Sequence, residues 1–228
     1  MHGTSRLFDR LLKVLPHGIS PRVIEYATDE VLGYDQLLRR VEVPREPFAI
    51  VAESFSGPLA IRLAARGPTN LRGLVLAASF ARSPRPIVPR WAAGLVRSWL
   101  FRIPLPQAGI RRMLLGDDAP REELVEVCEE HRKVRPAVLA ARIRAVLTVD
   151  VRDEFERIRV PILYLAGRRD RVVPPRVAQE LQSLRPDLEM VTLDSPHAVL
   201  QRQPMEAASV IGRFLLEKIA STGEPSAR

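Results

Sequence analysis

Three polar side chains follow predicted buried strands, each at the point where its strand ends. Ser54 ends the apolar run FAIVAES, Asp170 lies in GRRDRVVPP after PILYLAG, and His197 lies in SPHAVLQRQP after LEMVTLD. A serine hydroxyl is too weakly acidic to attack an acyl carbon at neutral pH, so an imidazole must accept its proton. A carboxylate then fixes the imidazole tautomer and stabilises the imidazolium. These residue types predict acyl transfer, with Ser54 as nucleophile, His197 as base and Asp170 as the orienting acid.

The strands that must position these side chains alternate with helical patterns. We expect strands at 22–27, 48–54, 71–79, 160–167 and 188–194, and helices at 7–15, 33–41, 56–67, 174–184 and 204–219. Such alternation is typical of an α/β fold with a mostly parallel sheet and flanking helices. In an open parallel sheet the carboxyl ends of the strands meet at one crevice, where distant residues can come together.

The alternation stops from Arg82 to about Arg159, where only helical patterns occur. In PRWAAGLVRSWLF, a helix would place Trp91, Leu95 and Trp99 on one face. We expect residues 82–159 to form an all-helical cap, residues 1–81 and 160–220 to form the core, and residues 221–228 to be a disordered tail.

Several motifs resemble the α/β-hydrolase superfamily, in the branch that carries a helical cap. AESFSGP resembles its nucleophile elbow, GRRDRVVPP its acid turn and SPHAVLQRQP its histidine loop, in the order Ser, Asp, His. HGTSRLFDRLL resembles the DGTGRLF loop that carries an oxyanion donor in some members. The resemblance covers almost the whole chain. It implies a serine hydrolase that cleaves a carboxylic ester or thioester through an acyl-enzyme, without a cofactor or a metal.

The resemblance also implies further site residues. Because Ser54 would begin a helix, the Phe55 N–H is one expected oxyanion donor, and Met1 would occupy the position of the second. Gly3 and Thr4 would shape the substrate loop. The Trp91 and Trp99 face could line an acyl pocket, although helix packing is the favoured alternative. The excess positive charge of 82–159 would suit an anionic acyl substrate or an anionic membrane surface.

The chain departs from the family pattern at two places. Ala52 and Ser56 stand where the elbow usually has glycines, with Gly57 directly after them. Members also have a strand before the oxyanion loop, so we expect the natural start to lie upstream of Met1. Three alternatives stay open: a backbone-bonded role for Ser54, Asp194 as the acid, and a non-catalytic relative acting as a binding or interaction module.

Composition limits the other classes of function. The 228 residues carry a net charge of +8, mostly from arginine spread along the chain with acids interleaved. No basic run contains stacking aromatics, so nucleic-acid binding is disfavoured. No apolar stretch is long enough to span a bilayer, and charged residues interrupt the first fifteen positions, so we expect no secretory signal there. The single cysteine, Cys128, suits a reducing compartment. We therefore expect a cytoplasmic enzyme with a small-molecule acyl substrate. The oligomeric state is left open.

Overall fold

The computed structural model describes residues 4–85, 88–102 and 106–221. At its centre lies a four-stranded, entirely parallel sheet in the order β1-β2-β3-β4. The strands are β1 (Phe48–Glu53), β2 (Leu71–Ala77), β3 (Ile162–Gly167) and β4 (Glu189–Leu193). The two central strands are buried on both faces, as their continuous apolar sequences predict.

The strand register brings the carboxyl ends of the strands to one edge. Glu53 at the end of β1 pairs with Ala77 at the end of β2, and Gly167 at the end of β3 pairs with Leu193 at the end of β4. The segments that carry Ser54, Asp170 and His197 all leave the sheet at this edge. The fold thus places the three predicted chemical groups on one side of the molecule.

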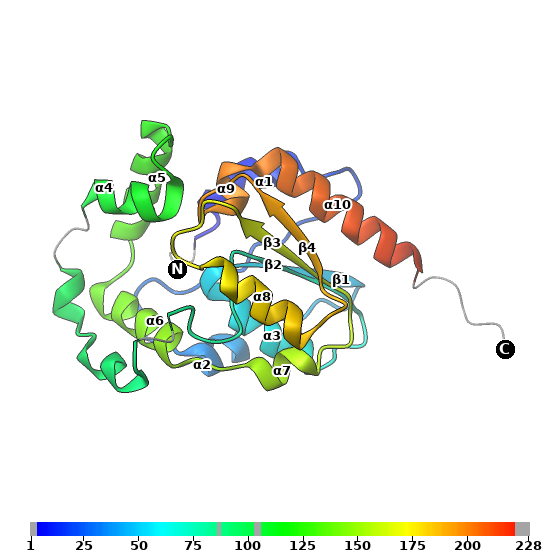
Figure 1. The fold of residues 1–228 in the computed structure, drawn as a ribbon, viewed down its shortest axis with the longest axis horizontal. Helices are drawn as coiled ribbons and strands as arrows, with labels where there is room; N and C mark the ends of the chain where they lie inside the picture. The colour runs from blue at the N-terminus through cyan, green and yellow to red at the C-terminus, as the bar shows by residue number, and fades with distance from the viewer. Residues whose placement is uncertain (1–3, 86–87, 103–105, 222–228) are drawn as a thin grey trace.

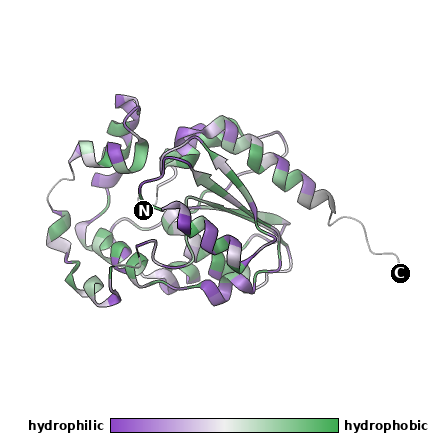
Figure 2. Cartoon of the chain, in the orientation of Figure 1, coloured by the Kyte–Doolittle hydropathy of each residue, from purple (hydrophilic) through white to green (hydrophobic). Residues whose placement is uncertain are grey.

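Helices cover both faces of the sheet (Figure 1). One face packs against α2 (Tyr34–Arg39), α3 (Gly57–Ala65), α7 (Arg152–Glu156) and α8 (Pro175–Leu184). The other packs against α1 (Asp9–Leu12), α9 (Val199–Arg202) and α10 (Pro204–Ser221). Figure 2 shows apolar strands at the centre and polar outer faces on the helices. No helix in the described part of the chain combines the length and the apolar character needed to cross a bilayer.

A helical segment connects β2 to α7 and lies beside one end of the sheet (Figure 1). It contains the 3-10 helices η3 (Arg90–Leu95) and η4 (Ser98–Phe101), α4 (Gln107–Ile110), the π-helical turn η5 (Arg111–Leu115), α5 (Arg121–Arg132) and α6 (Pro136–Thr148). An isolated antiparallel bridge joins Arg82 to Asp150 at the base of this segment. Its role as a cap, and the boundaries at 82 and 159, stay predictions.

Ion pairs connect α5 to the core. Arg10 of α1 pairs with Glu123 and Glu126, and Arg6 in the 3-10 helix η1 (Arg6–Phe8) pairs with Glu129 at 3.1 Å. Arg202 of α9 pairs with Glu123 at 2.8 Å. Acidic side chains of α5 therefore face basic side chains of the core.

The predicted strand at 22–27 is wrong, because this segment is irregular. At its end, backbone groups bond to the helical segment instead: the carbonyl of Ala27 accepts from Arg142, and that of the next residue, Thr28, accepts from the backbone N–H of Arg135. Within the described residues β1 is an edge strand whose only partner is β2.

The continuous helix predicted for PRWAAGLVRSWLF is also wrong. The chain forms η3 and η4 instead, because Val96 and Arg97 are extended between them. Gly94, a poor helix former, precedes this break. The helix predicted at 7–15 is shortened to η1 and α1. Of the tail predicted at 221–228, Ser221 ends α10, and residues 222–228 lie outside the described residues.

Candidate active site

Ser54 lies at a sharp turn between β1 and the helices that follow it. The 3-10 helix η2 (Ser54–Ser56) begins at this residue and leads directly into α3. Ser54 has a φ of +52°, a conformation that costs a non-glycine residue about 1–3 kcal/mol. The Ser79 hydroxyl donates to the Ser54 carbonyl at 3.0 Å, and the Gly57 N–H bonds to the same oxygen. Neighbouring groups thus hold the strained turn in place.

The glycine that this turn requires is Gly57. A Cβ atom there would lie 1.5 Å from Ser79 Oγ, so no larger residue fits without a shift. At the two positions where the family usually has glycine, Ala52 is buried in the core and Ser56 Oγ accepts from the Tyr26 hydroxyl at 2.9 Å. The position that has no room for a Cβ atom is therefore Gly57, one residue after Ser56, where the family motif has its second glycine.

The structure brings Ser54, His197 and Asp170 into one hydrogen-bonded line. Ser54 Oγ lies 2.8 Å from His197 Nε2, and His197 Nδ1 lies 2.9 Å from Asp170 Oδ2. The Asp170 and His197 side chains are only 3% and 8% exposed. The other carboxylate oxygen, Oδ1, accepts from the N–H groups of Val172 and Val173 at 2.7 and 2.9 Å, which orients the carboxylate toward the imidazole.

The histidine loop packs closely on the end of β3. A Cβ atom on Gly167 would lie 2.6 Å from the Pro196 carbonyl oxygen and 2.7 Å from that of Ser195. The Ala198 N–H donates to the carbonyl of Leu114 in the helical segment at 2.9 Å. Gly167 thus allows the backbone contact that sets the position of His197, and the helical segment supports the loop from the other side.

The alternative acid, Asp194, points away from the imidazole. Its side chain is 63% exposed and pairs with Arg169 at 3.3 Å. Arg169 also pairs with Asp118, and Arg171 with Asp117, so these arginines join the acid turn to the helical segment.

Sequence reasoning missed Glu53, the residue before Ser54. Its two carboxylate oxygens accept from the Leu200 N–H at 3.1 Å and from Gln201 Nε2 at 2.8 Å. Burial raises the pKa of the Glu53 carboxyl above its usual 4.5, and these hydrogen bonds oppose that shift. Glu53 therefore connects the end of β1 to α9, the helix that follows His197. A polar residue at the end of a buried strand was the only signal in the sequence.

Phe55 packs into an aromatic cluster behind the turn. Its ring stacks on Tyr34 at 4.9 Å between centroids, and the Tyr34 hydroxyl donates to the Phe55 carbonyl at 3.0 Å. The buried Arg142 guanidinium lies 5.9 Å from the Phe55 ring centroid. Since η2 begins at Ser54, the Phe55 N–H lies in a first helical turn, where backbone N–H groups have no intrahelical acceptor.

The remaining predicted site residues lie elsewhere or outside the described chain. Met1 and Gly3 are outside the described residues. Thr4, the first described residue, is half-buried. Trp91 and Trp99 are 72% and 57% exposed, which disfavours both a buried pocket wall and a helix-packing role. Among residues 4–85, 88–102 and 106–221, no His, Cys, Asp and Glu side chains gather as metal ligands would.

Comparisons with known proteins identify the family of this chain. The family model described as serine aminopeptidase, S33 matches residues 16–191, a span that includes Ser54 and Asp170 and ends before His197. A pimeloyl-[acyl-carrier protein] methyl ester esterase from Neisseria meningitidis is 25% identical over 259 aligned positions, covering 99% of this chain and 77% of that protein. An enzyme of the same name from Vibrio cholerae is 44% identical over 64 residues, or 28% of this chain and 25% of its own length.

A solved structure shares the fold. An esterase from Exiguobacterium antarcticum superposes with a TM-score of 0.76 at 14% identity, covering 94% of this chain and 88% of that one. The relatives and the family model together identify a hydrolase of the esterase type. This chain belongs to the serine aminopeptidase S33 family, and it is an ester-cleaving serine hydrolase with the α/β-hydrolase fold.

Proposed function

We propose that Ser54, His197 and Asp170 are the catalytic residues of this ester hydrolase. The observation that carries the proposal is the continuous pair of hydrogen bonds from Ser54 Oγ through the imidazole to Asp170. His197 Nε2 accepts the Ser54 proton as Oγ attacks the acyl carbon, and then donates it to the leaving alkoxide. Water, deprotonated by the same nitrogen, cleaves the acyl-enzyme and releases the carboxylic acid.

The oxyanion of the tetrahedral intermediate needs donors that are already oriented. We propose the Phe55 N–H as one of them, because Ser54 begins η2 and the Tyr34 hydroxyl holds the Phe55 carbonyl. Met1 remains the proposed second donor on the family resemblance alone. The helical segment at 82–159 would cover the acyl chain as a cap.

For the substrate, we propose a carboxylic ester in which the acyl chain is joined to a carrier. The support is the name shared by the relatives, pimeloyl-[acyl-carrier protein] methyl ester esterase. A thioester is the alternative. We propose that the enzyme acts in the cytoplasm, a reducing compartment that suits a chain with a single cysteine.

Hydrolysis of p-nitrophenyl acyl esters, followed by release of methanol from pimeloyl-carrier methyl ester, tests the proposal. We expect Ser54→Ala and Asp170→Asn to reduce kcat by about a thousandfold or more. Asp194→Asn is the matched control and should retain activity, because its carboxylate is exposed and paired with Arg169. Equal losses in the two aspartate variants would contradict the assignment of the acid. An inactive wild-type chain would favour the non-catalytic alternative.

A further inference from the structure

Large apolar side chains face solvent on residues 88–102. They are Trp91, Leu95, Trp99 and Leu100, here called the tryptophan patch. Other apolar side chains of residues 88–102 pack inward: Ala93 is buried, and Phe101 contacts a cluster formed by Val134, Val138 and Leu139. The two 3-10 helices therefore contribute some apolar side chains to internal packing and leave four large ones exposed within ten residues.

The size of the tryptophan patch is typical of a binding surface. At 72% and 57% exposure, Trp91 and Trp99 alone present on the order of 250 Å² of surface. The largest apolar patch on a soluble monomer is about 300–600 Å² and is often functional. The added area of Leu95 and Leu100 brings the patch into this range.

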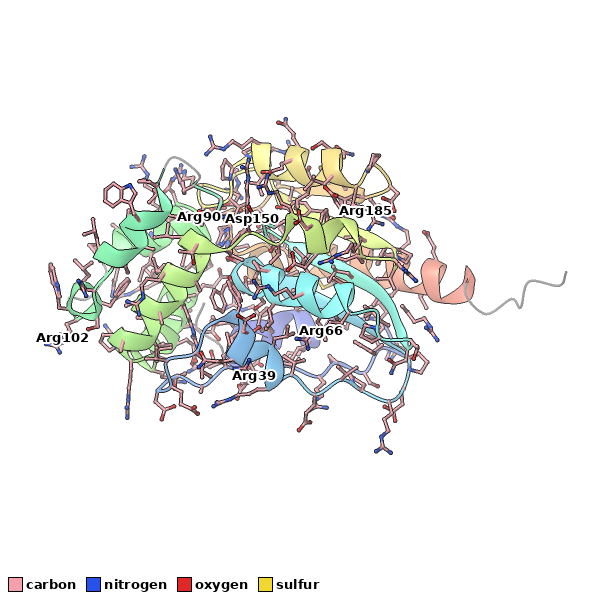
Figure 3. The ribbon with its side chains drawn as sticks, turned by 90° about the horizontal axis from the view of Figure 1, so that it is seen from below. Arg39, Arg66, Arg90, Arg102, Asp150 and Arg185 are labelled. Carbon is pink, nitrogen blue, oxygen red and sulfur yellow. The ribbon has the colours of Figure 1, made fainter. Side chains whose placement is uncertain are left out.

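The surroundings of the patch are strongly basic. Residues 54–116 contain ten arginines and no aspartate or glutamate, although acids are interleaved with arginine in the rest of the chain. Arg97 and Arg102 are exposed, and the described part of the chain offers neither of them a carboxylate partner. Arg90 pairs with Asp150 at 3.2 Å and is also largely exposed. Figure 3 shows Arg90 and Arg102 on the helical segment, and Arg39 and Arg66 on helices of the core.

We propose that the tryptophan patch, with Arg97 and Arg102, binds an anionic lipid surface. Tryptophan and leucine suit the boundary between headgroups and acyl chains, and arginine forms strong hydrogen bonds with lipid phosphates. The indole N–H groups of Trp91 and Trp99 also suit this boundary, because tryptophan gathers at headgroup level, where its ring meets apolar chains and its N–H meets polar groups.

The chain contains its own probe for this test. Trp91 and Trp99 are its only two tryptophans, so the intrinsic tryptophan emission reports on the patch alone. The full chain is mixed with vesicles of phosphatidylcholine, with or without phosphatidylglycerol. We expect a blue shift of the emission, and quenching by brominated lipids, only when phosphatidylglycerol is present. High salt should reverse both changes, because it screens the arginine–headgroup attraction.

Variants locate the binding surface. Each arginine near an anionic membrane contributes a factor of about five to binding, so Arg97→Gln/Arg102→Gln should weaken the vesicle partition coefficient about 25-fold. Arg39→Gln/Arg66→Gln is the matched control, since it removes the same charge from exposed arginines on the core (Figure 3). It should bind as the wild type does. Hydrolysis of a water-soluble ester should be unchanged in both variants, which separates this proposal from the proposed catalytic residues.

Three results would overturn the lipid proposal. The first is an unchanged emission spectrum with every vesicle composition. The second is equal weakening by the two arginine pairs. The third is a blue shift produced by purified acyl-carrier protein, or by raising the concentration of the chain itself, with none produced by vesicles. That result would assign the patch to a protein partner or to self-association.

Discussion

Different kinds of contact stabilise the carboxyl edge of the sheet and the helical segment beside it. At the edge, short hydrogen bonds and direct backbone contacts fix Ser54, His197 and Asp170, and several of these groups are buried. The helical segment has some buried contacts too, such as the hydrogen bond of Arg142 to the Ala27 carbonyl, but α5 also depends on partly exposed ion pairs with Arg6 and Arg10. Buried contacts tolerate little displacement, whereas exposed ion pairs contribute about 0–1 kcal/mol each. The three proposed catalytic residues therefore lie among buried contacts, whereas the ion pairs of α5 are contacts that can change more easily.

The largest effect is expected at Gly57. Gly57→Ala places a Cβ atom 1.5 Å from Ser79 Oγ, so either α3 or Ser79 must move. Overpacking of this kind costs about 1–3 kcal/mol, and here it also distorts the turn at Ser54. We expect a lower midpoint of urea unfolding and a large loss of kcat. The double variant Gly57→Ala/Ser79→Gly should recover part of the stability; no recovery would contradict the contact.

A smaller effect is expected at Gly167. Gly167→Ala pushes on the carbonyl oxygens of Ser195 and Pro196 and displaces the histidine loop from the end of β3. Because small displacements of a catalytic group can cost about a hundredfold in rate, kcat should fall by roughly 10- to 100-fold, with KM nearly unchanged. Gly109→Ala, where an added Cβ meets nothing within 4 Å, is the control. Similar kinetics in the two variants would show that the loop is not positioned in this way.

The third prediction concerns Glu53 and separates positioning from charge. Glu53→Ala removes the acceptor of Leu200 and Gln201, so kcat should fall by about tenfold. Glu53→Gln can still accept from the Leu200 N–H through its amide oxygen. If the Gln201 amide flips, its oxygen, which is buried and has no partner in the described residues, can accept from the new amide nitrogen. It should recover most of the activity. Equal loss in both variants would assign the effect to charge rather than position.

Glu53 also predicts a pH dependence of stability. Burial raises the pKa of its carboxyl in the folded chain above 4.5. Between the unfolded and folded pKa values the folded state binds more protons, so this residue's contribution to the free energy of unfolding falls as pH rises through that window. Urea unfolding as a function of pH should show the wild type losing stability relative to Glu53→Gln above about pH 4.5. A constant difference between the two proteins would contradict the pKa shift.

The smallest effect is expected at the ion pairs of α5. Glu126→Gln removes one partner of Arg6 and Arg10, and should change the free energy of unfolding by less than about 1 kcal/mol. If these ion pairs hold the helical segment near the candidate site, Glu126→Gln should change KM more than it changes the free energy of unfolding. Because salt screens exposed ion pairs, a higher salt concentration should change the KM of the wild type more than that of Glu126→Gln. A decrease of more than about 2 kcal/mol in the free energy of unfolding would show that the ion pairs of α5 contribute as much as the buried contacts at the sheet edge.

Most of the sheet could be predicted from the sequence, because buried parallel strands are continuous apolar runs. FAIVAES, LRGLVLAAS, PILYLAG and LEMVTLD all lie where they were expected. The segment at 22–27 is shorter and carries Arg22 and Glu25, and at its end the Ala27 carbonyl bonds to Arg142 rather than to a neighbouring strand. Trp91 and Trp99 show the same limit, because helical spacing does not reveal the break at Val96 and Arg97.

At the site, residue types and order were enough to select Ser54, Asp170 and His197, because each follows a strand at the same edge. The supporting residues could not be predicted, since Gly57, Gly167 and Glu53 act through contacts with residues distant in the chain. The two glycines expected from the motif are replaced by Ala52 and Ser56, and the requirement for a missing Cβ is met at Gly57.

Labelling with a fluorophosphonate probe tests the central claim most directly, because the probe reacts covalently with an activated serine. We predict that mass spectrometry of the labelled wild-type chain will find the adduct on Ser54. Ser54→Ala should carry no adduct, and His197→Ala should label far more slowly. An adduct on another serine, or equal labelling of the wild type and Ser54→Ala, would contradict the assignment of Ser54 as the nucleophile.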